Sequence, residues 1–304
     1  PAGRLSPWHK LFGASRVSSI GGGASAAMAA TATTDFATSS ATTVFATSPD
    51  TAPLRGPSSL LESCERVYLD FGTNIGFKLR ELYEPHVARV GTRQPSTFFA
   101  PLNLTANFTS RSDVCALAFE PVPRNVIKCN YVVEALRRRA LIGPHVHFFP
   151  AAIGTSNGTA RFYVDDSPNN IANNWGSSLL RWQHGMENRS RVDVPVVGLS
   201  TLLERHVPAA AKVVAKMDVE GAEYDVVPAA LNAICDHVDV LYLEMHHRFF
   251  SPKWRGHRSD MIDDGRIARL RDALATMKKR SHEGQCRTKI VSMGSAEREV
   301  GAYG

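Results

Sequence analysis

The sequence contains no run of 18 or more apolar residues, so no segment of it is long enough to span a bilayer. It has only five cysteines, an odd number without any Cys-x-x-Cys pair, which argues against both a disulfide scaffold and a structural zinc site. It also lacks a strong charge imbalance. A net charge of +6, from 35 basic and 29 acidic residues, is too diffuse to indicate a nucleic-acid partner. The 304 residues, 43% of them hydrophobic, are enough for one large domain or two small ones, and exclude collagen, a coiled coil and a wholly disordered chain.

The composition changes sharply near residue 57. The chain before this point is rich in Ala, Ser, Thr and Gly and has no helical or strand periodicity. Such a segment buries too little apolar surface to offset its ordering entropy, so we predict a disordered tail over residues 1–59 and a folded domain over residues 60–304. The tail is also poor in acidic residues and mildly basic, as organelle transit peptides are, and a featureless tail is the alternative. The localisation therefore stays open between an organelle and the cytoplasm.

The folded part alternates between apolar runs and helical stretches. Strands are predicted at residues 66–71, 114–119, 145–153, 212–217, 238–243 and 288–292, with helices at 76–83, 125–139 and from 221 onward. Apolar runs that alternate with helices predict an α/β fold built on a doubly wound, mostly parallel sheet. Ligands of such sheets bind beyond the carboxyl ends of the strands, so the residues that follow each strand are the ones to inspect.

The first such ending is the segment 70–76, Asp-Phe-Gly-Thr-Asn-Ile-Gly. Gly72 and Gly76 allow a tight turn and a close approach of the backbone to a ligand where a Cβ would intrude, and the helix behind them offers free N–H groups. The segment differs from the Gly-x-Gly-x-x-Gly of nicotinamide dinucleotide folds. Asp70, two residues before the first glycine, suits a cofactor with a cationic amine. An ordinary strand-to-helix turn is the alternative.

The second ending is the segment 119–125, Phe-Glu-Pro-Val-Pro-Arg-Asn. An acidic residue at this position commonly accepts hydrogen bonds from ribose hydroxyls, which makes Glu120 a candidate cofactor residue. A solvated carboxylate at a strand end is the alternative. The two prolines cannot continue the sheet and fix the exit of the chain.

Two carboxylates, Asp218 and Glu220, follow the strand 212–217 and precede a turn at Gly221. Beside a cleft, such groups can act as a general base or orient a hydroxyl. A carboxylate here can instead bind the free amides at the start of the next helix. We expect Glu220 to do this and Asp218 to face the site.

Glu244, His246 and His247 follow the next strand in the same way. Adjacent residues of an extended chain point to opposite faces, so the two histidines are poorly placed to share an ion, and we predict no metal site. His246 is the reserve candidate for a catalytic base, because the ordinary pKa of histidine, near 6.5, suits proton transfer.

Taken in order, these strand endings resemble the FkbM family of S-adenosylmethionine-dependent methyltransferases. The resemblance rests on four motifs and on Leu243-Glu244, and it extends from about Arg66 to the end of the chain; the motifs are the segments 70–76, 119–125, 151–154 (Ala-Ala-Ile-Gly) and 216–223 (Lys-Met-Asp-Val-Glu-Gly-Ala-Glu). It implies the class I methyltransferase fold, with a seven-stranded sheet whose last strand runs antiparallel.

The resemblance also implies roles for individual residues. The turn of the first motif would line the methionine part of the cofactor, Glu120 would bind the ribose, and Ala151-Ala152 would lie near the adenine. The cofactor-binding residues are thus predicted to be Asp70, Gly72, Asn74, Gly76, Glu120, Asn125, Ala151 and Ala152. Asp218, Glu220 and His246 are the predicted catalytic residues, on the acceptor side.

Two segments depart from what a class I enzyme needs. Residues 90–113 form a long insertion, for which a lid, an acceptor wall and a surface excursion are all open. Residues 165–185 carry four asparagines, Asn169, Asn170, Asn173 and Asn174, together with Trp175 and Trp182. Amide and indole groups suit a sugar-like or other polar acceptor, although asparagine can also merely supply turns.

The leading hypothesis is therefore an S-adenosylmethionine-dependent methyltransferase that methylates a hydroxyl of a small-molecule or glycan acceptor. An N-methyltransferase and a non-catalytic protein that keeps the fold to bind a cofactor or a partner are the alternatives. Neither a nucleic-acid partner nor a membrane-spanning segment is expected.

Overall fold

The structure is a computed structural model of the whole chain, and it describes residues 59–85, 97–102, 108–166, 174–180, 190–246 and 264–293. The predicted tail lies outside these residues except for Ser59, so its disorder and the division into two parts stay predictions. Within the described residues, no helix combines the length and the apolar character needed to cross a bilayer.

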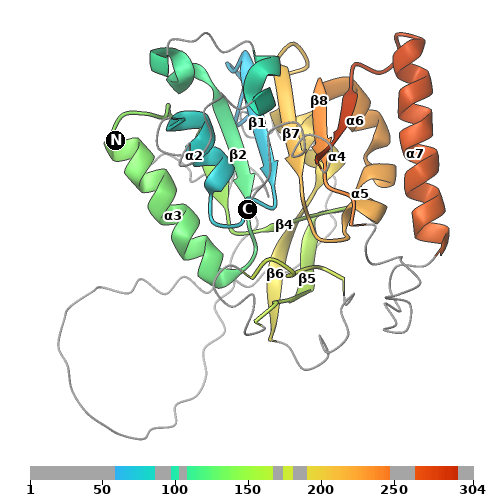
Figure 1. Cartoon of the computed structure of the whole chain (residues 1–304), viewed down its shortest axis with the longest axis horizontal. Helices are drawn as coiled ribbons and strands as arrows, with labels where there is room; N and C mark the ends of the chain where they lie inside the picture. Colours follow the sequence, from blue (N-terminus) through green and yellow to red (C-terminus); the bar gives the residue numbers. More distant parts are fainter. Residues whose placement is uncertain are drawn as a thin grey trace, which may run out of the picture. The chain divides into compact units, whose positions relative to one another are not determined.

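A six-stranded sheet forms the centre of the molecule (Figure 1). Its strands run in the order β3-β2-β1-β7-β8-β9, and every neighbouring pair is parallel. This confirms the predicted doubly wound α/β fold, although the described sheet has six strands, all parallel, where seven with an antiparallel last strand were expected. The bounds are β1 Arg66–Phe71, β2 Cys115–Phe119, β3 Val146–Phe149, β7 Lys212–Met217, β8 Val240–Leu243 and β9 Lys289–Ser292.

The order of the strands reverses between β1 and β7. The chain builds outward from β1 through β2 to β3, returns to the other side of β1 as β7, and then adds β8 and β9. In open parallel sheets, ligands bind in the crevice at this switch point, outside the carboxyl ends of the strands. The topology therefore directs attention to the segments that follow β1 and β7.

Helices connect the strands, and α3 packs beside β3 while α7 packs against α5 and β9 (Figure 1). The helix predicted at 125–139 begins two residues earlier, because Pro123 occupies its first turn, where a missing N–H costs nothing. The helix predicted from 221 onward is divided at Ala230 into two. The bounds are α2 Phe77–Tyr83, α3 Pro123–Arg138, α4 Leu199–His206, α5 Glu223–Ala229, α6 Leu231–His237 and α7 Asp264–His282.

A second, three-stranded sheet was not predicted. It consists of β4 Ala152–Gly154, β5 Gly158–Tyr163 and β6 Arg191–Gly198, in the order β4-β6-β5. The predicted strand 145–153 is in fact two strands, β3 in the large sheet and β4 in the small one, separated by Pro150. Figure 1 shows the small sheet near the arrowhead ends of β1 and β2, which are their carboxyl ends.

Part of the 90–113 insertion packs into the core. It forms two short 3₁₀ helices, η1 Thr97–Leu102 and η2 Phe108–Asp113. Phe98 and Phe99 are buried, with Phe98 stacked on Tyr242 at 4.0 Å between ring centroids and Phe99 edge-on to Tyr68 at 5.1 Å. The helix η1 is therefore not a lid, an acceptor wall or a surface excursion, since it packs inside the hydrophobic core.

Two disulfides correct the expectation from the cysteine pattern. Cys64 pairs with Cys115, and Cys235 pairs with Cys286, while Cys129 is a buried free thiol. Each bond joins cysteines 51 residues apart. Wide spacing along the chain argued against pairing, but parallel strands bring their amino ends together and so bring distant cysteines into contact.

Candidate functional site

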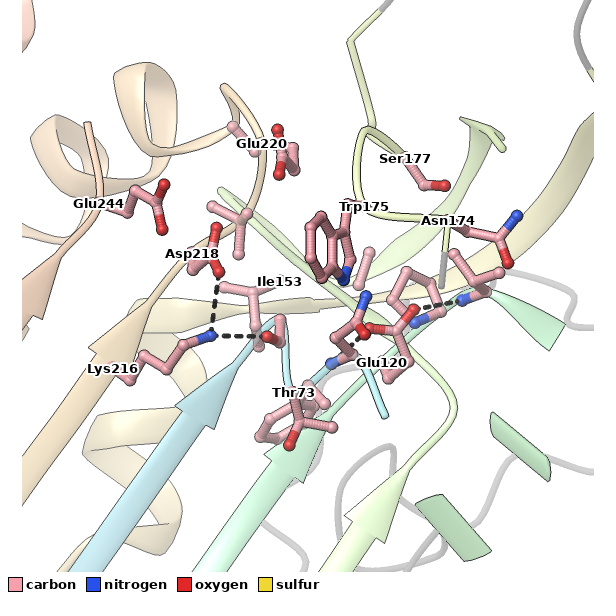
Figure 2. A pocket seen from close by; sticks show the side chains of 18 of the residues that line it. Thr73, Glu120, Ile153, Asn174, Trp175, Ser177, Lys216, Asp218, Glu220 and Glu244 are labelled. Carbon is pink, nitrogen blue, oxygen red and sulfur yellow. Dashed lines mark hydrogen bonds and ion pairs between the residues drawn. The ribbon is translucent and has the colours of Figure 1, made fainter. Parts of the chain in front are cut away.

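A cavity of about 510 Å³ opens at the carboxyl ends of the central strands. Its walls come from the segments that follow β1, β2, β7 and β8, and from the small sheet through Ile153 and Phe162. The volume lies within the range of cavities that hold cofactors and small ligands. In Figure 2, Asp218, Glu220 and Glu244 lie on one side of the cavity, and Glu120 and Asn174 lie on the other.

The turn between β1 and α2 contains three left-handed residues, at every second position. Gly72, Asn74 and Gly76 have φ values of 80°, 52° and 81°. The N–H groups of Gly72 and Thr73 both donate to the carbonyl of Phe119, at 3.1 and 3.0 Å, which ties this turn to the end of β2. A left-handed residue other than glycine is strained, and such strain concentrates at functional sites.

Gly72 is required for a different reason from the one that the sequence suggested. A Cβ at this position was expected to intrude on the ligand, but it would overlap the carbonyl oxygen of Asp218. The glycine therefore allows the loops after β1 and β7 to touch, and this contact closes the floor of the cavity at the switch point.

Lys216 also links the loops that follow β1 and β7. Its Nζ donates to the Gly72 carbonyl at 2.7 Å and lies 3.2 Å from Asp218 Oδ2 (Figure 2). It also lies 3.7 Å from Asp70 Oδ1. Burial alone would lower the pKa of the lysine, but Asp218 and Asp70 raise it to about 12, so Lys216 carries a charge. Lys216 was not among the predicted site residues, although a lysine inside an otherwise apolar strand is a signal that could have found it.

Asp70 lies behind the cavity wall. It is fully buried, accepts a hydrogen bond from Thr73 Oγ1 at 2.5 Å, and does not line the cavity. Burial raises the pKa of its carboxyl group, against the opposing effect of Lys216. In this structure Asp70 lies behind the wall and shapes the turn through its bond to Thr73.

Glu120 anchors the opposite side of the cavity. Its Oε2 accepts the N–H of Asn74 at 3.0 Å and its Oε1 accepts the N–H of Val122 at 2.9 Å. Burial raises the pKa of this carboxyl group to about 7, although these two bonds and one to the Asn125 side chain oppose the rise. Each carboxylate oxygen has a second lone pair, so Glu120 keeps acceptor capacity for ligand hydroxyls.

The end of the cavity near the small sheet combines an apolar wall with one orphan acceptor. Ala151 and Ala152 line it, as the resemblance implied. Asn174 lines it as well; its Nδ2 donates to the Asp165 carbonyl at 2.9 Å, whereas its buried Oδ1 has no hydrogen-bond partner among the described residues. A ligand that donates a hydrogen bond is the natural partner for that oxygen.

Trp175 stands at the mouth of the cavity, 62% exposed. A large exposed ring beside a cavity is an available stacking surface. Of the polar segment 165–185, Asn174 and Trp175 are described and line the cavity. The other predicted residues, Asn169, Asn170, Asn173 and Trp182, lie outside the described residues.

On the other side of the cavity, Glu220 has a different role from the one expected. It was expected to bind the amides at the start of the next helix, but no described side chain caps α5. Glu223, the first residue of that helix, accepts the N–H of Gly221, two residues before the helix begins, at 2.8 Å. Glu220 instead adopts a left-handed conformation, with φ of 51°, and its side chain lines the cavity. The tight turn at Gly221 carries the next glutamate, Glu223, back under the loop.

His246 lies behind these carboxylates rather than in the cavity. Its Nδ1 lies 2.9 Å from Glu223 Oε1, and its Nε2 lies 3.2 Å from Glu220 Oε2 and 3.7 Å from an Asp218 oxygen. Burial alone would lower the pKa of the imidazole, but Glu220 and Glu223 raise it to about 11. The suggestion that His246 is a base with an ordinary pKa is therefore wrong for this environment.

Glu244 completes this acidic side. Burial raises the pKa of its carboxyl group to about 7, helped by the neighbouring charge of Asp218. Asp218, Glu244 and His246 each place one possible ligand atom within 4.8 Å of the others. The prediction of no metal site was based only on the pair His246 and His247, and not on this group. His247 lies outside the described residues.

Of the predicted cofactor residues, five line the cavity and three lie behind it. Those in its wall are Gly72, Asn74, Glu120, Ala151 and Ala152; those behind are Asp70, Gly76 and Asn125. Of the predicted catalytic residues, Asp218 and Glu220 line the cavity and His246 does not. Their roles stay predictions, but all eleven belong to one region of the molecule.

Comparison with known proteins identifies a family that matches this chain. The family model described as the methyltransferase FkbM domain matches residues 70–279. No curated protein matches the chain. Among solved structures, the methyltransferase FkbM from Methylobacillus flagellatus KT is similar, with 15% sequence identity and a TM-score of 0.31, over 57% of this chain and 31% of that one. Such a distant structural likeness carries no argument about function, whereas the family match covers more than half of the chain.

Proposed function

This chain belongs to the methyltransferase FkbM family, and we propose that it transfers the methyl group of S-adenosylmethionine to a hydroxyl of a sugar-like or other small polar acceptor. The family supports a methyltransferase; the acceptor and the methylated atom are our proposal. The observation that carries it is one cavity at the switch point with two chemically different sides, one suited to a nucleoside and the other to an alcohol.

The side formed by Glu120 and the small sheet suits the cofactor. Glu120 offers acceptor oxygens for ribose hydroxyls, and the apolar wall at Ala151 and Ala152 offers a surface for a purine ring. The orphan Oδ1 of Asn174 lies in the same cavity and would accept from an exocyclic amine. We place the methionine part against the turn at Gly72, next to the contact with the β7 loop.

The side formed by the carboxylates suits the acceptor. In the reaction, the acceptor oxygen attacks the methyl carbon in line with the sulfonium, the carbon–sulfur bond breaks, and S-adenosylhomocysteine leaves. The hydroxyl loses its proton during this attack. Asp218 lines the cavity beside the cofactor turn, so we assign it to orient the hydroxyl or to accept its proton, an effect worth roughly 10²–10⁴-fold in rate.

The mouth of the cavity suits a polar ring. Trp175 offers an exposed indole face, and Ser177 adds a hydroxyl to the same wall. An aromatic face with neighbouring hydrogen-bonding groups is suited to a sugar, which has one apolar face and a rim of hydroxyls.

Cofactor binding is the first test. At 100 times its dissociation constant, S-adenosylhomocysteine should stabilise the protein by about 2.7 kcal/mol. For a domain of this size, that raises the melting temperature by roughly 5–11 °C. NAD at the same concentration is the control and should give no shift. The absence of a shift with both S-adenosylmethionine and S-adenosylhomocysteine would overturn the proposal.

Transfer is the second test. Purified protein with labelled S-adenosylmethionine is supplied with fractionated cell extract and with a panel of glycans, and the label is followed into hydroxyl or amine groups. Asp218→Asn should lower kcat much more than it weakens cofactor binding, because it keeps the shape and removes the base. Cofactor binding without transfer to any fraction would favour the non-catalytic alternative, and label on nitrogen would favour the N-methyltransferase.

A further inference from the structure

The acidic side of the cavity contains an unusual mixture of donors. Asp218 follows β7, Glu244 and His246 follow β8, and these are neighbouring parallel strands whose carboxyl ends meet. The imidazole Nε2 lies 3.7 Å from Asp218 Oδ1 and 3.9 Å from Glu244 Oε1. With Glu220 Oε2 at 3.2 Å, three carboxylates thus converge on one ring nitrogen.

These separations fit the coordination of one ion. Metal–ligand bonds to oxygen and imidazole nitrogen are about 2.0–2.6 Å long, so two ligands of the same ion are at most about 4–5 Å apart. The three ligand atoms lie within 4.8 Å of one another. The two carboxylates, Asp218 and Glu244, are partly exposed, at 27% and 36% of their side chains.

The support behind the imidazole is the second, independent observation. A metal-binding histidine characteristically gives its other ring nitrogen to a carboxylate, which fixes the ring and directs the remaining nitrogen at the ion. Here Nδ1 lies 2.9 Å from Glu223 Oε1, and Glu223 is itself fully buried and fixed by the N–H of Gly221. Nε2 is thereby directed at the carboxylates.

Glu244 adds a third observation. Its side chain is 36% exposed and lines the cavity. Among the described residues, its carboxylate makes no hydrogen bond, and its ion pair is the one with His246 at 3.9 Å. A carboxylate held near other carboxylates at a cavity wall without a donor of its own is ready to bind a cation.

We propose that Asp218, Glu244 and His246 form a divalent-cation site at the acceptor end of the cavity. Two oxygens and one imidazole nitrogen differ from the all-oxygen cages typical of Ca²⁺ and Mg²⁺, and they suit a first-row cation such as Mn²⁺. Three protein ligands leave coordination positions open toward the cavity, which is the arrangement of catalytic rather than structural metal sites.

The use of this cation rests on the proposed function. An acceptor hydroxyl that binds a divalent cation loses its proton more easily, because the cation stabilises the alkoxide. Asp218 then holds the cation, and Glu220, which lines the same wall, takes the proton as the oxygen attacks the methyl group. Acceptors able to bind through two neighbouring oxygens, as many sugars are, gain an additional contact.

Mn²⁺ binding to the full, chelator-treated chain tests the site directly. Free Mn²⁺ gives a six-line electron paramagnetic resonance signal that bound Mn²⁺ loses, so a titration yields both the number of sites and their affinity. We expect one saturable site per chain, in the presence or absence of S-adenosylhomocysteine. Glu244→Gln should weaken it at least about tenfold. Because Glu244 is partly exposed, this variant should melt close to the wild-type temperature.

Asp193→Asn is the matched control. It also removes one carboxylate, but from an exposed position on β6 whose partner is Arg161, and it should leave Mn²⁺ affinity unchanged. A wild-type chain without a saturable site, or a Glu244→Gln variant that binds like the wild type, would overturn the site. The cluster would then be an internal ion network around a protonated His246.

Cofactor binding measured on the same samples separates this proposal from the proposed function. S-adenosylhomocysteine binding without Mn²⁺ binding overturns the metal site alone. Mn²⁺ binding without any response to S-adenosylhomocysteine or S-adenosylmethionine leaves the site intact and overturns the methyltransferase assignment.

Discussion

Replacing Lys216 by methionine tests how the two loops at the switch point are held together. Methionine keeps most of the length and apolar volume of the lysine stem and removes the ammonium group, with its charge and its N–H donors. The substitution deletes the bond to the Gly72 carbonyl and leaves Asp70, which is fully buried, without its nearby cation. Asp218 loses an ion-pair partner as well.

The expected loss of stability is large. Removing one partner of a buried ion pair costs about 3–5 kcal/mol, because the other charge stays buried and uncompensated. For a domain of this size, the melting temperature should fall by roughly 6–20 °C. Lys212→Met, on the same strand, is the control. Lys212 is 42% exposed, and its partner Asp239 keeps Arg287 at 2.6 Å, so the loss there should be below about 1 kcal/mol.

The pH dependence gives a second signature. Burial already raises the pKa of Asp70, and the loss of Lys216 raises it further. A carboxyl group whose pKa is raised by folding stabilises the folded state below its unfolded pKa, and this contribution is lost as the pH rises through the folded pKa. The deficit of Lys216→Met relative to the wild type should therefore be smallest at acidic pH and grow toward neutral pH.

Calorimetry of the wild type, both single variants and the double variant Asp70→Asn/Lys216→Met measures these effects. The double variant should regain part of the lost stability, since it removes the uncompensated charge. S-adenosylhomocysteine affinity should fall in Lys216→Met, because the turn at Gly72 loses its support. Equal melting temperatures for Lys216→Met and Lys212→Met would refute the reasoning.

Three further predictions concern the turn, the buried glutamate and the disulfides. Gly72→Ala should lower both the melting temperature and cofactor affinity, whereas Gly284→Ala, with a similar positive φ but open space around it, should cost only the roughly 1–2 kcal/mol of a left-handed alanine. Burial raises the pKa of Glu120 from 4.5 to about 7, so the ionisation of this carboxyl group should reduce the free energy of unfolding by about 3 kcal/mol as the pH rises through that interval. Calorimetry at a series of pH values should show a flatter dependence of stability on pH for Glu120→Gln. Replacing Cys235 and Cys286 by serine opens a 51-residue loop, which chain entropy values at roughly 4 kcal/mol, and an unchanged melting curve would contradict the bond.

Much of the central sheet could be predicted from apolar runs. β1, β2 and β7 are buried on both faces, so they appear as continuous apolar stretches ending at a polar residue. The small sheet escaped because it follows a different pattern. In β6, Val192, Val194 and Val196 alternate with polar residues, and Pro195 in their midst argues against a strand.

The location of the site could be predicted, and its internal contacts could not. Asp218 and His246 follow neighbouring strands, so a parallel sheet necessarily brings them to one edge. That Glu223 holds His246, and that Lys216 joins two loops, depends on where individual side chains turn after a left-handed residue. No periodicity in the sequence carries that information.

The two disulfides have a consequence for how a ligand could enter and leave. Cys64 precedes β1 and Cys115 begins β2, while Cys235 lies in α6 before β8 and Cys286 precedes β9. All four are at the amino ends of the strands, and the cavity is at the carboxyl ends. One edge of the sheet is thus covalently pinned, and the other is closed only by hydrogen bonds and ion pairs. Amide hydrogen exchange should be slow along the pinned edge and faster in the loops around the cavity. A ligand would therefore enter and leave by movements of these loops, while the amino ends of the strands stay fixed.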